Sequence, residues 1–306
     1  MAARTGIKEF SDNGAELCSI NRVTARQRLI GYKKHPGSFI LLILVVLAAA
    51  ITVGILLFLV GYVLIKGLPN ITAAQFSVKY DSENVSMLPA IVNTVIMVVL
   101  SLIAAVPVGI FSAVYLTEYA KRGSKAVTVI RLTAETLSGI PSIVYGLFGF
   151  LVFVVALGWS YSMLSGVLTM SIMILPLIIR TTEEALMSVP DSYREGGFGL
   201  GAGRLRTVFR IVLPSAAPGI FSGIILAIGR IVGESAALIF TAGTSPVIAK
   251  GLFSSARTLS VHIYALYNEG LYTNEAFAAS AVLLAVVLII NAISDFAASR
   301  LNRKNR

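Results

Sequence analysis

The sequence has little charge and almost no cysteine or histidine. Only 13% of its 306 residues are charged, whereas 56% are hydrophobic and the mean hydropathy is +0.84. Since roughly 25% of the residues of a soluble domain are charged, this composition excludes an ordinary soluble protein and predicts a polytopic membrane protein. Cys18 is the single cysteine, which excludes an intrachain disulfide framework. The two histidines, His35 and His262, are widely separated in the sequence and predict no metal site.

The sequence also lacks the phosphate-binding loop G-x-x-x-x-G-K-[ST], because none of its lysines precedes Ser or Thr. It offers no set of nucleophile, base and orienting group, so an enzymatic function is not expected. We expect no metal or cofactor on this chain, and any ATP-driven process would need a separate ATPase. The net charge of +10 does not require a nucleic-acid partner, because Lys and Arg in cytoplasmic loops that set membrane topology explain it.

Long uncharged stretches predict six transmembrane helices in an all-α fold. The stretches long enough to span a membrane are Gly37–Ile65, Asn84–Thr117, the two halves of Thr136–Ile179 around a turn at 158–162, about Pro214–Gly243, and about Ala276–Ser294. They predict a transmembrane domain at 38–298, between a basic N-terminal segment at 1–37 and a C-terminal tail at 299–306. The N-terminal segment is compatible with a surface helix or with a disordered tail.

The distribution of Lys and Arg predicts the orientation of the chain. With the N-terminus inside, the inner segments carry 20 Lys and Arg and the outer segments carry 4. Cytoplasmic loops are enriched in these residues. Both termini and the loop at about 181–213 are therefore predicted to be cytoplasmic in a cell-membrane protein.

The loop at 181–213 is too strongly patterned for a simple tether. Asp191 and Ser192 after Pro190 predict a helix start with a side-chain cap, and the glycines between 196 and 203 predict a tight turn. Apolar residues then recur at the spacing of one helix face, at Leu205, Val208, Phe209 and Val212. We expect a short helix, a Gly-rich turn and an amphipathic helix that runs into the fifth span. The segment could lie on anionic lipid or insert into a protein groove, and its glycines favour the groove.

Two charged residues fall inside the fifth span. Arg230 and Glu234 are four residues apart, which places them on one face of a continuous helix. Each costs about 2.5–3.5 kcal/mol on the insertion scale, so they should face the bundle interior or a water-filled path. A guanidinium offers two parallel donors to an oxyanion such as phosphate. Arg230 and Glu234, with the adjacent Ser235, are therefore candidate substrate-path residues, and a structural ion pair is the alternative.

Two further features are expected at the start of the third span. Glu135 is predicted to pair with Arg131 or Arg122. Pro141 is predicted to break the helix, and the small residues of the surrounding 138–149 stretch allow close approach of another helix.

The spacing in the cytoplasmic loop resembles a signature of ABC importer membrane subunits. That signature reads Glu-Ala-Ala, three residues, Gly, nine residues, Ile, one residue, Leu-Pro. The matching residues here are Glu195, Gly196, Gly197, Gly201, Ile211, Leu213 and Pro214, with glycine at 196 and 197 in place of alanine. The resemblance implies that these residues couple the chain to a separate ATP-binding subunit.

Three stretches resemble the A-type permease family of the Pst phosphate importers, namely TAETLSGIPSIVYGLFG, GRIVGESAALIFTAG and TLSVHIYALYNEG. The resemblance covers residues from about 85 to 297 and implies a type I ABC importer permease (MetI-like) fold. It also implies a path for inorganic phosphate past Arg230 and Glu234 in the lipid membrane. The implied partners are a C-type permease in a heterodimer, two copies of an ATPase that carries ATP and Mg²⁺, and an external phosphate-binding protein. Alternatives are a sulfate or molybdate permease, the C-type partner itself, and a secondary transporter that uses Glu234 as a proton site.

Overall fold

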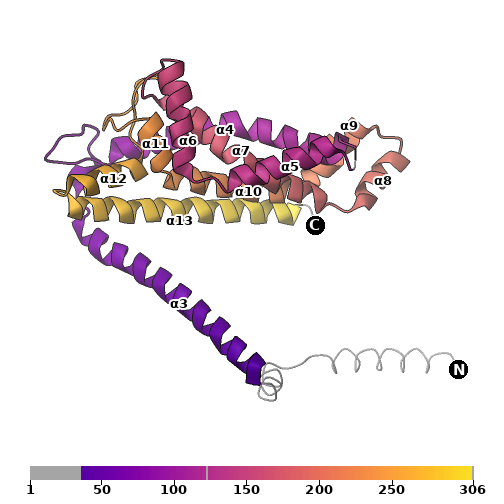
Figure 1. Ribbon diagram of the computed structural model, residues 1–306, viewed down its shortest axis with the longest axis horizontal. Helices are drawn as coiled ribbons and strands as arrows, with labels where there is room; N and C mark the ends of the chain where they lie inside the picture. Colours follow the sequence, from indigo (N-terminus) through magenta and orange to yellow (C-terminus); the bar gives the residue numbers. More distant parts are fainter. Residues whose placement is uncertain (1–35, 122, 305–306) are drawn as a thin grey trace. The chain divides into compact units, whose positions relative to one another are not determined.

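The computed structural model describes residues 36–121 and 123–304, and the chain divides into two units, Met1–Tyr62 and Val63–Arg306. The predicted N-terminal segment therefore lies outside the described residues except for positions 36 and 37, and residues 305–306 of the predicted tail also lie outside them. The described residues form helices and no strands, which confirms the all-α prediction (Figure 1).

Five helical segments are long and apolar enough to cross a membrane. They are Gly37–Asn70, Leu88–Tyr119, Met163–Met187, Arg204–Gly233 and Thr273–Ile293. A sixth span results if Lys125–Ser138 and Ser142–Ala156, which are bent by 100° at a short break, form one broken span together. The six predicted spans thus correspond to these five segments and the broken pair.

The first of these segments consists mainly of α3 (Pro36–Gly67), most of which belongs to the first unit. In the second unit, α7 is the central helix and packs against both α4 and α10 (Figure 1). The bounds are Leu88–Val114 for α4, Met163–Met187 for α7, Leu213–Gly233 for α10 and Thr273–Lys304 for α13. Large side chains that are less than 2% exposed fill the core between α4, α7 and α10, including Met97, Met170, Ile174 and Ile231. This core fixes the helices that carry the candidate site residues.

The predicted break at Pro141 is confirmed. The helix α5 (Lys125–Ser138) ends before it, and α6 (Ser142–Gly149) begins after it and continues as the π-helix η4 (Phe150–Ala156). Proline lacks the backbone N–H that would continue the helix. The predicted start of this span at Thr136 is wrong, because α5 begins at Lys125 and includes charged residues that the uncharged stretch left out.

Charged side chains of α5 reach across to α7. The guanidinium of Arg131 forms an ion pair with Glu183, and Oε1 of Glu135 is 3.7 Å from Nη1 of Arg180. The predicted pairing of Glu135 with Arg131 is therefore wrong, because both side chains bind partners on α7 rather than each other. Arg122, the other predicted partner, lies outside the described residues.

Close packing by small residues in the 138–149 stretch is confirmed. A Cβ placed on Gly146 would lie 2.7 Å from Cα of Ala237, which belongs to α11 (Ala236–Thr241). A Cβ placed on Gly149 would lie 2.1 Å from Oγ1 of Thr169 on α7. These contacts hold α6 against α11, which follows Arg230 and Glu234, and against α7.

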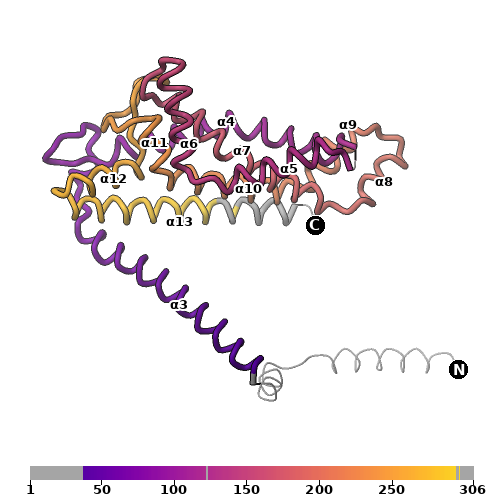
Figure 2. Tube along the Cα trace, viewed as in Figure 1, coloured from indigo at the N-terminus to yellow at the C-terminus, as the bar shows by residue number. Residues whose placement is uncertain are grey.

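The loop at 181–213 lies far from the segment at 259–269. Figure 2 shows α8 (Asp191–Gly199) and α9 (Arg204–Thr207) at the opposite end of the second unit from α12 (Leu259–Glu269). The helix α9 continues through the π-helix η5 (Val208–Val212) into α10.

Candidate functional site

The fifth predicted span is interrupted at Glu234, the second of its two charged residues. The helix α10 ends at Gly233, and Glu234 has extended backbone angles, φ −77° and ψ 129°. The chain then forms the short helix α11. The carbonyl oxygen of Ser235 accepts the first backbone hydrogen bonds of this helix. The prediction of one helix from Pro214 to Gly243 is therefore wrong.

Glu234 caps the helix that follows it. Its Oε1 accepts a hydrogen bond of 3.1 Å from the backbone N–H of Ala237, and its backbone oxygen accepts one from the hydroxyl of Ser260. A carboxylate at a helix N-terminus binds the N–H groups that have no partner within the helix. The side chain of Glu234 is thus held by α11, whereas its backbone N–H donates to the carbonyl oxygen of Ile231 in α10.

Arg230 lies in the last turn of α10 and is half-buried. The predicted shared helix face with Glu234 is wrong, because α10 ends between the two residues. Among the described residues, no ion pair joins Arg230 to Glu234 or to another carboxylate. A cation in the last turn of a helix is stabilised by the helix dipole. Arg230 therefore lies at the C-terminal end of α10, just before the break, where the helix dipole favours its charge.

The loop at 181–213 has the predicted order of a short helix, a turn and a second helix. The short helix is α8, the turn lies at 200–203, and Gly201 has a left-handed φ of +79°. The second helix runs from α9 through η5 into α10. The predicted side-chain cap is wrong, because the residue at the cap position is Pro190 and it makes no side-chain hydrogen bond.

The predicted apolar face of the second helix is split. Val208 and Val212 are 1% and 0% exposed, whereas Leu205 and Phe209 are 66% and 40% exposed. The stretch from Val208 to Val212 is π-helical, so its turns are wider than those of the α-helix assumed for the pattern. Leu205 in α9 and Phe209 in η5 point away from the core that Val208 and Val212 enter.

The residues of the coupling signature have different environments. Gly197 is buried, and a Cβ there would meet Cγ2 and Oγ1 of Thr207 and Cδ1 of Ile211, each at 3.0 Å. Glu195, Gly196 and Pro214 are exposed, and Leu213 is half-buried beside the core of α4 and α7. The signature therefore combines a close helix contact at Gly197 and Ile211 with a solvent-facing side at Glu195.

An ion pair that the sequence does not reveal joins the loop to α4. Nη2 of Arg194 lies 2.7 Å from Oε1 of Glu118, which is in the π-helix η3 (Tyr115–Tyr119) at the end of α4. Hydrogen bonding to Glu118 raises the pKa of Arg194 above its usual value. Arg194 directly precedes the signature residue Glu195, but its partner is 76 positions earlier and no local pattern connects them.

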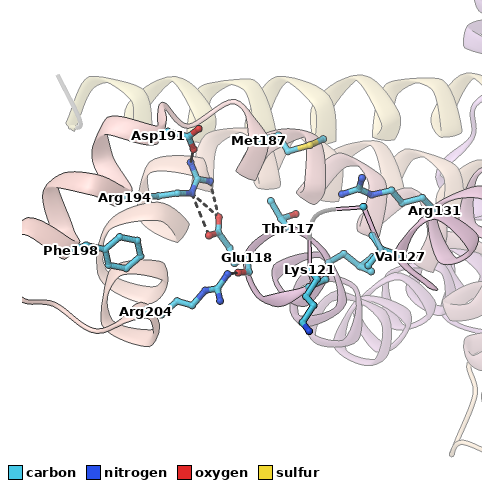
Figure 3. A pocket seen from close by; sticks show the side chains of 13 residues that line it. Thr117, Glu118, Lys121, Val127, Arg131, Met187, Asp191, Arg194, Phe198 and Arg204 are labelled. Atoms are coloured by element: carbon cyan, nitrogen blue, oxygen red, sulfur yellow. Dashed lines mark hydrogen bonds and ion pairs between the residues drawn. The ribbon is translucent and has the colours of Figure 1, made fainter. Parts of the chain in front are cut away.

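A cavity of about 730 Å³ adjoins this ion pair. Figure 3 shows Glu118, Arg194 and Arg204 at one side of it and Lys121 and Arg131 at the other. The space lies between η3, α5 and α8, so these three segments meet around a hollow lined by both charged and apolar side chains rather than around a packed core.

Comparison with known proteins relates the chain to transport components. The family described as "Binding-protein-dependent transport system inner membrane component" matches residues 105–306. A probable ABC transporter permease protein of Bacillus subtilis, YqgI, is 35% identical over 284 residues, covering 84% of this chain and 94% of its own length. The phosphate transport system permease protein PstA 1 of Mycobacterium tuberculosis is 36% identical over 220 residues, covering 70% of this chain and 71% of its own length.

Solved structures share the fold at low sequence identity. A bacterial ABC transporter involved in the import of the acidic polysaccharide alginate has a chain with a TM-score of 0.59 and 21% identity, covering 89% of this chain and 99% of that one. A chain of the MetNI methionine ABC transporter, in an inward-facing conformation, has a TM-score of 0.54 and 18% identity and covers 70% of this chain and 94% of its own.

Proposed function

Because this chain belongs to the family of binding-protein-dependent transport system inner membrane components, we propose that it is the permease subunit of an ATP-driven importer of inorganic phosphate. The all-helical structure and the two solved transporters confirm the predicted ABC importer permease fold. The chain is a multi-pass membrane protein, and as an ABC permease it acts with an ATPase and a binding protein.

The observation that carries the proposed substrate path is Arg230. Its guanidinium has no carboxylate partner among the described residues and lies beside the break between α10 and α11. Phosphate is the oxyanion proposed because several relatives at about 36% identity are phosphate transport permeases. In this proposal Arg230 binds the anion with two parallel N–H groups. Glu234, held by α11, limits the strength of that binding by its negative charge, and Ser235 lines the same break.

The proposal assigns the cytoplasmic loop to ATPase coupling. Glu195 and Gly196 form the exposed side of α8, and Gly197, Gly201, Ile211, Leu213 and Pro214 shape the helix, the turn and the entry into α10. Leu200 at the turn is 91% exposed, which suits insertion into a groove of another protein.

The full assembly that we propose is a heterodimer with a C-type permease, joined by two ATPase copies and an external phosphate-binding protein. ATP and Mg²⁺ would be bound by the ATPase, and this chain would hold neither a nucleotide nor a metal. Both termini would be cytoplasmic, as the excess of Lys and Arg predicts.

Uptake of labelled phosphate at low external concentration tests this proposal. Cells that lack the chain would receive the native protein, Arg230→Gln, Arg230→Lys or the control Lys79→Gln, with membrane levels measured for each. Lys79 is an exposed cation before α4, so its variant removes one charge away from the break. We expect uptake with the native protein and Lys79→Gln, loss with Arg230→Gln, and partial recovery with Arg230→Lys, which keeps the charge but not the two-pronged geometry.

Other outcomes of the same experiment identify the alternatives. Normal uptake with Arg230→Gln would make Arg230 a structural residue. Stronger competition by sulfate or molybdate than by unlabelled phosphate would show a permease for another oxyanion. Uptake that persists after ATP depletion but stops when the proton gradient collapses would show a secondary transporter.

A further inference from the structure

A buried ion pair ties α8 to the end of α4. Nη2 of Arg194 is 2.7 Å from Oε1 of Glu118, and the two side chains are only 15% and 8% exposed. Nε of Arg194 donates to the same oxygen at 3.1 Å. By contrast, the Arg180–Glu184 pair on α7 has side chains that are 54% and 60% exposed. Since water screens the exposed pair far more than the buried one, we expect the loss of the Glu118–Arg194 pair to cost more than the loss of the exposed pair.

Arg194 also holds the end of α7. Its Nη2 donates to the carbonyl oxygen of Leu186 at 2.9 Å, and its Nη1 donates to that of Val189 at 2.8 Å. The last carbonyl groups of a helix have no partner within the helix. The guanidinium supplies those partners while it binds Glu118, so a single side chain of α8 is attached to two membrane helices.

Glu118 is also held from the other side of the Gly-rich turn. Arg204, the first residue of α9, donates to the backbone oxygen of Glu118, and its guanidinium lies 5.2 Å from the ring centroid of Tyr119. The helices on both sides of the turn thus converge on one residue of η3 (Figure 3). Displacement of the turn relative to α4 requires these contacts to break.

Apolar packing does not attach α8 in the same way. Val114 of α4, Leu186 of α7 and Val208 of η5 share a buried apolar cluster. Gly197 is the buried residue of α8, and its close neighbours belong to α9 and η5. The link from α8 to α4 therefore depends on the polar contacts of Arg194 rather than on a shared core.

We propose that Glu118 and Arg194 are positioning residues that transmit the displacement of α8 to α4 and α7. This inference rests on the proposed function, in which α8 docks on the ATPase. The ATPase pulls α8, and the ion pair makes the ends of α4 and α7 follow. Without the pair, α8 still docks but moves partly on its own, so ATP is hydrolysed with less transport.

The first test measures phosphate transported per ATP hydrolysed by the complete transporter in liposomes. The variants are Glu118→Gln, Arg194→Gln and their double variant, and the control is Glu184→Gln, which breaks the exposed pair on α7. We expect the ATPase subunits to stay bound to each single variant. We expect the ratio of phosphate transported to ATP hydrolysed to fall at least fivefold in each. The double variant should be no worse than Arg194→Gln alone, because Glu118→Gln removes an interaction that Arg194→Gln has already removed. A lower yield of complex with an unchanged ratio would mean a merely structural role and overturn the proposal.

The second test measures motion and needs no transported substrate. Spin labels at Ser192→Cys on α8 and Lys121→Cys after η3, in a Cys18→Ser background, report the distance between the two segments in the complete transporter. We expect one narrow distance, unchanged by ATP, in the native protein, and a broad or ATP-dependent distance in Glu118→Gln. An identical narrow distance in that variant would overturn the inference. If the native protein imports no phosphate but the distance still depends on Glu118, the proposed substrate is wrong and the inference stands.

Discussion

Gly197 of α8 lies directly against Thr207 of α9. A Cβ placed on Gly197 would be 3.0 Å from both Oγ1 and Cγ2 of Thr207, whereas a Cβ on the neighbouring Gly196 would meet nothing within 4 Å. The two adjacent glycines of this motif therefore have different structural roles. One permits a close contact between helices, and the other faces solvent.

The first prediction separates these two glycines. Gly197→Val should displace α8 from α9 and reduce the amount of ATPase that copurifies with the chain, because its branched side chain has no space beside Thr207 and Ile211. The matched Gly196→Val variant should copurify with as much ATPase as the native chain does. Gly196→Ala should stabilise α8 by up to about 1 kcal/mol through helix propensity. Equal ATPase recovery with both valine variants would contradict this assignment.

The second prediction concerns the turn. Gly201 has φ +79° with open space around its Cα, so Gly201→Ala meets no neighbour but must adopt a left-handed backbone. That conformation costs an L-residue about 1–2 kcal/mol. We expect a lower melting temperature of the purified chain for Gly201→Ala and none of this loss for Gly199→Ala, which is in α8 and also has open space. An unchanged melting temperature for Gly201→Ala would show that the turn relaxes freely.

The third prediction tests the packing of α10 on α7. A Cβ on Gly223 would lie 2.1 Å from Oγ1 of Thr181, whereas Gly229 on the same helix has no neighbour within 4 Å. Gly223→Ala should destabilise the protein by about 1–3 kcal/mol, because the two helices must separate or repack. Gly229→Ala should not destabilise it. Thermal unfolding in detergent compares the two variants, and equal melting temperatures would disprove the contact.

The fourth prediction concerns pH and His262 on α12. Burial, together with the nearby charge of Arg257, lowers the pKa of His262 from 6.5 to about 4. Nη1 of Arg257 is 3.1 Å from Nδ1 of His262, so protonation would place two cations side by side. The unfolded chain binds this proton more readily, so stability should fall as the pH drops from 6.5 towards 4. The loss should be about 2 kcal/mol between pH 7 and pH 5.

Melting temperatures of the native protein and His262→Asn across this pH range check the prediction. The asparagine variant has no titrating group at this position, so its stability should fall less between pH 7 and pH 5. Parallel curves for the two proteins would show that His262 does not titrate differently in the folded and unfolded states.

Sequence reasoning located the membrane helices because their signal is local. The length of an uncharged stretch shows directly whether it can span a bilayer. This criterion predicted the helices α3, α4 and α7. The helix–turn–helix order of the loop at 181–213 was also predictable, since glycine clusters and apolar periodicity act over a few residues. The same reasoning placed the break at Pro141, where the ring removes a backbone donor.

What sequence reasoning missed depends on contacts between distant residues. The start of α5 at Lys125 could not be read from hydropathy, because its charged residues bind partners on α7. The end of α10 at Gly233 was missed because no proline marks it, and the backbone turns where Glu234 caps α11. The ion pair between Glu118 and Arg194 joins segments 76 positions apart, a relation that no local period encodes.

The central claim is ATP-driven phosphate import through this chain, and reconstitution tests it most directly. The complete transporter would be placed in liposomes with labelled phosphate and its binding protein on the outer side and ATP inside. We predict accumulation of phosphate inside that requires ATP, persists with a proton ionophore, and is lost with Arg230→Gln. Accumulation without ATP that disappears with the ionophore, or accumulation of sulfate or molybdate but not phosphate, would contradict the claim.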